Sequence, residues 1–280
     1  MNYKIISDSS SNIFHLSEIP YCSVPLKIIT SDKEYVDNSE LKITQMMEEL
    51  KNHSGTSSTS CPNAHEWEEA FGEADTIFAI TITSTLSGSC SAAIHAGQEF
   101  EEHHPGSKVC VIDSLSAGPE MGLLIHKLQE LMVQKLSFEE IKDTILSYQK
   151  HTHLLFSLQS LDNLVRNGRV HPAVAKMAGL LGIRIVGKAS EEGTLKPLHK
   201  CRSEKRALKT ILKEMKKEGY AGERVRIAHC MNPDSAASLK QMIQDEFPQS
   251  SVAIEECAGL CSYYAEKGGL MIGYVDSLQE

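Results

Sequence analysis

Serine and threonine concentrate at four places in the first half of the chain, at residues 7–11, 54–60, 83–91 and 113–118. Hydroxyl groups donate and accept hydrogen bonds without carrying charge, so a group of them can hold a polar or anionic ligand. Any single one is better explained as a helix cap or a turn residue. Four clusters in one half of the chain favour a binding site.

Thr59 and Ser60 stand just ahead of an expected helix. They end a stretch over residues 54–60 that we interpret as one loop. Asn63, with Glu66 three positions later, is a variant of the capping box that begins a helix. The two hydroxyl groups should therefore lie close to a helix N-terminus.

Ser87, Gly88 and Ser91 lie where the strongest apolar run, residues 76–82, gives way to another expected helix. In an open α/β sheet, ligands bind outside the carboxyl ends of the strands. Helix N-termini there have unpaired N–H groups and a partial positive charge, so they favour anions. Glycine lets a ligand approach the backbone closely. The pattern predicts an anion site at this edge of the sheet.

A single carboxylate is the anion that the surrounding residues fit best. No Lys or Arg occurs between Lys51 and Lys108, whereas a polyphosphate usually needs lysine, arginine or a metal ion. Neither the P-loop nor the dinucleotide-binding glycine pattern is present. This disfavours one alternative, a nucleotide-dependent α/β enzyme. Hydroxyl and N–H groups can satisfy one carboxylate without a full counter-charge.

A serine acyl hydrolase is the second alternative, because Ser87 lies between a strand and a helix as the nucleophile of such an enzyme does. The G-x-S-x-G pattern is missing, since the local sequence is TLSGS. His95 or His126 would serve as the base only if the fold brought it to Ser87. The sequence therefore favours binding over acyl hydrolysis.

The spacing of apolar residues predicts an α/β protein with two domains, residues 1–155 and 156–280. Strand-like runs alternate with helix-periodic segments in the first, which predicts a parallel sheet with right-handed crossovers. In the second domain the strand-like and helix-like segments are shorter and include a hairpin, which predicts a mixed sheet. The expected strands are 3–7, 76–82, 109–112, 154–158, 183–186, 225–230, 251–255 and 270–275; the expected helices surround Trp67, Leu124 and Ile141 and cover 171–181 and 202–217.

Bulk properties exclude several classes of protein. The net charge of −9 disfavours binding to nucleic acid or to an anionic membrane surface. Eight scattered cysteines, no signal peptide and no transmembrane run indicate a cytoplasmic protein with reduced thiols that is not embedded in a membrane. The histidine and cysteine spacings match no ligand set, so we expect no metal.

Four runs together resemble the DegV family: residues 7–10 (SDSS), 59–63 (TSCPN), 86–92 (LSGSCSA) and 167–170 (NGRV). Their order and spacing agree over essentially the whole chain. The resemblance implies two α/β domains with one long-chain fatty acid, such as palmitate, stearate or oleate, between them. It implies no cofactor and no catalysis by the chain itself, since a separate fatty acid kinase phosphorylates the carboxylate with ATP.

The resemblance also implies roles for individual residues at the fatty-acid carboxylate. Thr59 and Ser60 match the family's Thr-Ser pair, and Ser87, Gly88 and Ser91 fall in its second carboxylate-side motif. These five residues are the expected carboxylate-binding set, and none is expected to be catalytic.

Arg169 and Tyr264 are expected near the head group or facing the kinase. Arg169 matches an arginine of the family, although Asn167 replaces the first glycine of that motif. Tyr264 replaces a family histidine, so it can keep a hydrogen bond but cannot supply a positive charge at neutral pH.

The acyl chain needs an apolar tunnel, which we expect near the domain interface. A charged helix in the second domain also offers five cations at helical spacing, either as a solvated face or as a docking surface for an acidic kinase. We expect a monomer. The tunnel candidates are Phe156, Leu164, Met177, Leu180, Leu181 and Ile183, and the five cations are Arg202, Lys205, Arg206, Lys209 and Lys213.

Overall fold

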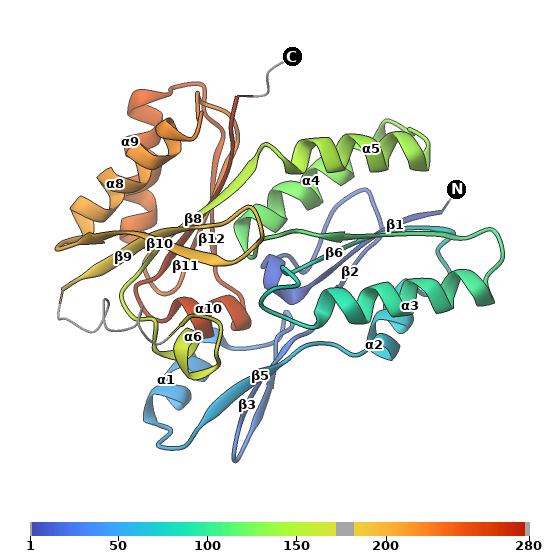
Figure 1. Ribbon diagram of the computed structural model, residues 1–280, viewed down its shortest axis with the longest axis horizontal. Coiled ribbons are helices and arrows are strands. Elements are labelled where there is room, and N and C mark those ends of the chain that lie inside the picture. Colours follow the sequence, from blue (N-terminus) through green and yellow to red (C-terminus); the bar gives the residue numbers. More distant parts are fainter. Residues whose placement is uncertain (1, 172–181, 278–280) are drawn as a thin grey trace.

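The computed structural model describes residues 2–171 and 182–277, which form three sheets (Figure 1). The first sheet is parallel throughout and has the strand order β2-β1-β6-β7. The expected strands near residues 3, 76 and 109 are confirmed as β1, β6 and β7. Its strands are β1 (Tyr3–Asp8), β2 (Tyr21–Val24), β6 (Thr76–Thr81) and β7 (Lys108–Asp113).

Helices cover both faces of this parallel sheet, which explains the near-continuous apolar run of β6. Ile77 and Ala79 pack in the cluster that α2 and α3 close. Phe78 and Ile80 point the other way, into the cluster beneath α4 and α5. The helices are α2 (Ala64–Phe71), α3 (Ser89–His103), α4 (Pro119–Val133) and α5 (Phe138–Gln149).

The second sheet is mixed and has the order β10-β9-β8-β13-β11-β12. Its neighbours are antiparallel except for the parallel pair β11 and β12. Helices α8 and α9 cover one face (Figure 1). The elements are β8 (Thr152–Leu158), β9 (Arg184–Ala189), β10 (Leu195–Cys201), α8 (Glu204–Lys217), β11 (Val225–His229), α9 (Pro233–Glu246), β12 (Val252–Glu256) and β13 (Leu270–Val275).

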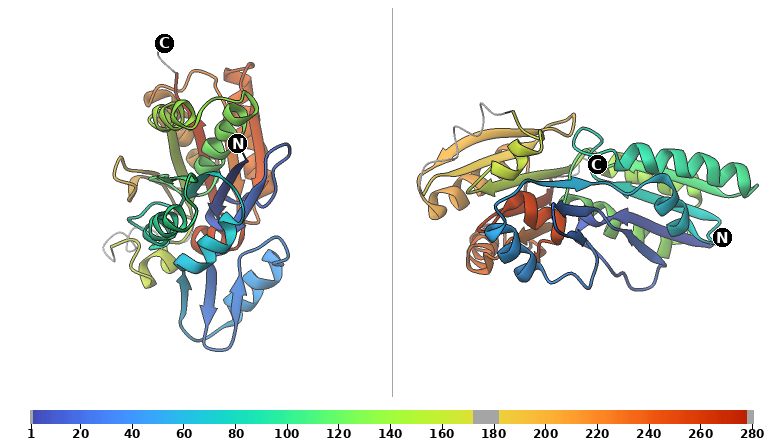
Figure 2. Two further views of the ribbon diagram at one scale, coloured as in Figure 1. Left: turned by 90° about the vertical axis from the view of Figure 1, so that its right-hand side faces the viewer. Right: turned by 90° about the horizontal axis from the view of Figure 1, so that it is seen from below.

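A small antiparallel sheet of order β4-β3-β5, which no apolar pattern predicted, projects from one end of the molecule with α1 (Figure 2). The expectation of a loop over residues 54–60 is wrong at its end, because Ser57–Ser60 is strand β5. Its pairing with β3 sets Thr59 opposite Ile28, so backbone hydrogen bonds hold a strand that has no apolar residue of its own. The other elements are β3 (Lys27–Thr30), β4 (Glu34–Val36) and α1 (Ile43–Asn52).

Two helices join the halves of the chain. Helix α4 contacts strands of both large sheets, and its first turn rests on Gly273, where an added Cβ would lie 2.6 Å from the backbone of Glu120. Helix α10 (Gly259–Ala265) comes from the second half but packs on α1, β3 and the short 3-10 turn η1 (Ser9–Ser11). The mixed sheet starts at Thr152, and the division at residue 155 stays a prediction.

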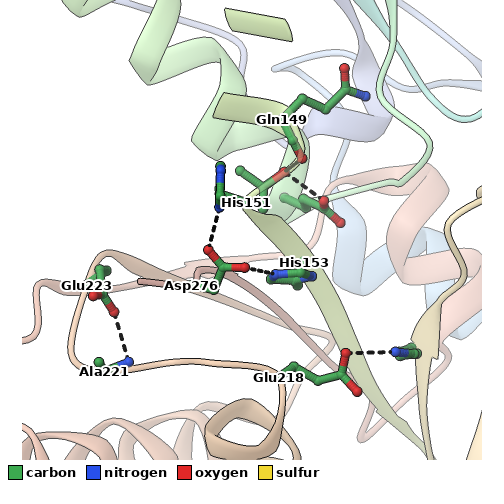
Figure 3. A network of polar contacts seen from close by, with 10 residues as sticks. Gln149, His151, His153, Glu218, Ala221, Glu223 and Asp276 are labelled. Atoms are coloured by element: carbon green, nitrogen blue, oxygen red, sulfur yellow. Dashed lines mark hydrogen bonds and ion pairs between the residues drawn. The ribbon is translucent and has the colours of Figure 1, made fainter. Parts of the chain in front are cut away.

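Asp276 links β8 and β13, the central pair of the mixed sheet, at one end of the pair (Figure 3). Its carboxylate lies 2.8 Å from His151 Nδ1 and 2.9 Å from His153 Nε2, so it joins the start of β8 to the segment after β13. The predicted helix over residues 171–181 lies outside the described residues from residue 172 onward.

Candidate binding site

An apolar cavity of about 270 Å³ lies between the mixed sheet, helix α10 and the loops of the parallel sheet. Strand β8 supplies Leu154, Phe156 and Leu158 from one face, because alternate residues of a strand point the same way. The next strand, β13, adds Met271 opposite Phe156. Further apolar walls come from Leu26, Ile82, Ala117, Leu164, Leu195, Leu260 and Ala265.

Polar groups gather at one part of this cavity, here called the polar end. Thr59 and Ser60 reach it from β5, and Ser87 and Gly88 reach it from the loop before α3. Tyr264 reaches it from α10, and its hydroxyl lies 2.7 Å from Thr59 Oγ1. Hydroxyls from three separate elements thus converge where a ligand's polar group would lie.

The N-terminus of α3 forms part of the polar end. Gly88 is its N-cap residue, and no side chain caps the helix from that position. An added Cβ on Gly88 would lie 3.2 Å from Cys61 Sγ, so glycine allows the backbone at residue 88 to pack closely against Cys61. The first turn of a 15-residue helix therefore presents its partial positive charge to the cavity.

Arg169 is the one charged side chain among the described residues that line the cavity. It is half-buried, and its Nε donates to Leu86 O at 3.1 Å while Nη1 donates to Asn167 O. In the described part of the chain, no carboxylate lies within ion-pair distance of it. The guanidinium is thus held by carbonyls and keeps its charge available for an anion.

Helix α10, which carries Tyr264, is fixed by a carboxylate from the first half of the chain. Asp37 is fully buried and accepts from Gly259 N at 2.6 Å and from Leu260 N at 2.9 Å. Burial raises the pKa of Asp37 to about 6, against the lowering effect of these hydrogen bonds. Burial also raises the pKa of the Tyr264 hydroxyl, which therefore stays a neutral donor at pH 7.

A second buried carboxylate, Asp8, organises the strand ends beneath the site. It accepts from Ile82 N at 2.8 Å and from Ser89 Oγ at 2.7 Å, so it links β1, β6 and the start of α3. Burial raises its pKa, and the hydrogen bonds oppose that rise. Asp8 was not predicted from the sequence as part of the site, although an acid between a strand end and three serines was a usable signal.

The structure brings most of the predicted site residues to one cavity. The exceptions are Ser91, which is exposed on the first turn of α3, and Ile183, which is half-buried beside the cavity without lining it. Met177, Leu180 and Leu181 lie outside the described residues. Those that line the cavity are Thr59, Ser60, Ser87, Gly88, Phe156, Leu164, Arg169 and Tyr264.

The arrangement offers binding groups without an evident base for acyl hydrolysis. No histidine occurs among the described residues that line the cavity. His95 is exposed on α3, and His126 on α4 lies with Arg224 and Arg226 at a separate hollow. Across residues 2–171 and 182–277, no cluster of His, Cys, Asp and Glu is arranged to hold a metal ion, and no helix is long and apolar enough to cross a membrane.

The fold and the cavity together define an α/β protein with an apolar cavity that is polar at one part. The model of the DegV family matches residues 2–276. A DegV domain-containing protein of Streptococcus pneumoniae is 44% identical over 278 residues, which are 98% of this chain and 99% of the relative. The chain belongs to the DegV family, as its motifs indicated.

Two solved structures resemble the chain over nearly its full length. The fatty acid kinase (Fak) B3 protein of Streptococcus pneumoniae, loaded with linoleic acid, has a TM-score of 0.96 at 44% identity and covers 98% of this chain and 99% of its own. A DegV family protein of Eubacterium eligens, loaded with heptadecanoic acid, has a TM-score of 0.96 at 39% identity, with coverage of 98% and 100%. The predicted fold class, a parallel sheet followed by a mixed sheet, is confirmed.

Proposed function

We propose that this protein binds one long-chain fatty acid in the cavity, with the carboxylate at the polar end. The observation that carries the proposal is the contrast within the cavity, where hydroxyls, a helix N-terminus and one arginine meet at one part of otherwise apolar walls. The fatty acids in the two similar structures support the same ligand class. Thr59, Ser60, Ser87, Gly88, Arg169 and Tyr264 form the proposed head-group site.

The acyl chain and the carboxylate contribute unequally to the binding free energy. Burying about 15 methylene groups at roughly 0.8 kcal/mol each contributes on the order of 12 kcal/mol before costs. Association and ordering reduce this by several kcal/mol. The acyl chain therefore supplies most of the affinity, while the polar end fixes which way the carboxylate faces.

The proposed role is that of a carrier without catalytic activity of its own, working with a separate fatty acid kinase. The similarity to a protein named for a fatty acid kinase supports the partnership. The cavity offers a carboxylate-binding end but no histidine among its described lining residues, which disfavours the acyl hydrolase. The eight cysteines are free, which suits the reducing cytoplasm where ATP-dependent chemistry takes place. We propose that the carrier is a monomer.

Helix α8 is the proposed docking surface for the kinase. Five cations at or before this helix are exposed, in a protein whose net charge is −9. None of the ion pairs among described residues engages them. The apolar face of the helix is buried against the mixed sheet, so only the cationic face is available to an acidic partner. The cations are Arg202, Lys205, Arg206, Lys209 and Lys213.

A coupled assay tests this function against the alternatives. The purified chain alone should turn over neither ATP nor fatty acyl esters. Addition of the catalytic subunit of a fatty acid kinase should produce fatty acid-dependent phosphoryl transfer that requires this chain. Ester hydrolysis by the chain alone, abolished by Ser87→Ala, would instead establish the acyl hydrolase.

A further inference from the structure

The acyl cavity has a neighbour with which it shares one lining residue. A second hollow of about 820 Å³ lies at the start of β8, and Leu154 lines both spaces. Leu154 is 2% exposed, and among the described residues it is the one that lines both hollows.

The second hollow lies where β8 and β9 are no longer paired. Their pairing runs from Leu158 opposite Ile185 to Leu155 opposite Lys188 and ends there. The three residues of β8 before Leu155 have partners only on β13. Leu154 is therefore the first residue beyond the paired part of the two strands, with its side chain on the cavity face.

Most of the residues around the second hollow have polar side chains, unlike those around the acyl cavity. They include Gln149, His153 and Glu218, which Figure 3 shows close to the start of β8. Lys188 Nζ lies 2.9 Å from Glu218 Oε2, and the buried Glu120 accepts from Thr152 Oγ1 at 2.8 Å. An apolar chain end would meet a more polar lining here than in the acyl cavity, whereas a polar chain end would find hydrogen-bond partners.

Leu154 lies at the part of the cavity farther from the head-group site along β8. Leu158, at the other end of the same strand face, leads directly into α6 (Asp162–Arg166) and then Arg169. The two leucines are four positions apart along the strand, a distance of about 13 Å. The methyl end of a bound fatty acid would therefore approach Leu154 rather than Leu158.

We propose that Leu154 ends the acyl cavity and limits the length of the bound chain, and that its side chain keeps acyl chains out of the polar hollow. This rests on the proposed fatty acid binding. Shortening Leu154 vacates the space of three side-chain carbons, which the extra methylenes of a longer chain can fill. It also joins the cavity to the polar hollow, so a hydroxyl group at the far end of a chain can reach polar partners.

The test compares wild type with Leu154→Ala by displacement of a fluorescent fatty acid, using saturated acids from laurate to behenate. Each methylene contributes about fourfold in affinity while it is buried. In Leu154→Ala, the affinity for arachidate relative to stearate should rise about tenfold over wild type. The preference for palmitate over its ω-hydroxy derivative should fall by about tenfold, because the hydroxyl then reaches polar partners.

Leu158→Ala is the matched control, because it removes the same atoms from the same strand face away from the polar hollow. It should weaken all chains without changing either ratio. Leu154→Phe fills the space further and should shift the optimum to shorter acids, so it decides the question if Leu154→Ala does not fold. Wild type that binds no fatty acid of any length would refute the proposed function itself. Wild type that binds fatty acids, with unchanged ratios in both folded Leu154 variants, would overturn only this inference.

Discussion

Replacing Arg169 with methionine separates the contribution of charge from that of the apolar cavity. Arg169 is the one charged residue among the described cavity-lining residues, and no carboxylate in the described chain neutralises it. Methionine keeps an unbranched apolar stem of similar reach but removes the charge and all donors. The variant should therefore lose carboxylate recognition and keep most of its affinity for the acyl chain.

The size of the effect follows from the environment of the guanidinium. A hydrogen bond to a charged group contributes about 1.5–3 kcal/mol, and the half-buried position of Arg169 favours that range over the small values of exposed ion pairs. The affinity for palmitate should fall about 10- to 150-fold. The affinity for methyl palmitate, which carries no charge, should change by less than about threefold.

Isothermal titration with the two ligands measures both effects in one variant. Arg166→Met is the matched control, because Arg166 is exposed on α6 three residues earlier and does not line the cavity. It should leave both affinities unchanged. Equal weakening of the acid and the ester by Arg169→Met would refute the reasoning, since it would mean that Arg169 acts by holding the loop through Leu86 O.

Three further predictions concern Tyr264, Asp37 and helix α8. Tyr264→Phe loses the hydroxyl that meets Thr59 at 2.7 Å, so fatty acid affinity measured by displacement should fall about fivefold, whereas an unchanged affinity would remove Tyr264 from the head-group site. The pKa of Asp37 is raised to about 6, so its share of stability is present at low pH and is lost as the pH rises through about 6. In urea unfolding, wild type should therefore gain about 1 kcal/mol relative to Asp37→Asn between pH 7 and pH 5, and parallel curves for the two proteins would contradict this. Charge reversal on α8 should abolish kinase-coupled turnover and leave lipid content intact, and a fully active variant would exclude this surface; the changes are Arg206→Glu, Lys209→Glu and Lys213→Glu.

Elements whose local residue pattern depends directly on burial or capping were predicted correctly from the sequence. The apolar run that became β6 lies between two helical layers, and the capping pair of Asn63 and Glu66 begins α2 as expected. Strand β5 was missed because Ser57–Ser60 has no apolar alternation, and its pairing with β3 is a contact between distant segments. Short strands of this kind carry too little periodicity to be recognised alone.

The polar end was easier to predict than the apolar walls. Thr59 and Ser87 lie in local motifs close to helix starts, so the sequence indicated both as cavity residues even though it missed strand β5, which carries Thr59. Leu154 and Met271 come together only through the pairing of β8 with β13, which links residues more than a hundred positions apart. Ser91 was predicted to bind the carboxylate because it belongs to a motif, but it is exposed on the first turn of α3 and does not line the cavity.

Native mass spectrometry of the freshly purified full chain tests the central claim most directly. We expect an added mass equal to that of one long-chain fatty acid, which is released on denaturation. Phe156→Asp, which places a charge in the cavity wall, should remove that mass, while Ile254→Asp, at a residue 38% exposed on β12, should retain it. Folded wild type without bound lipid, or folded Phe156→Asp with wild-type lipid content, would contradict the account.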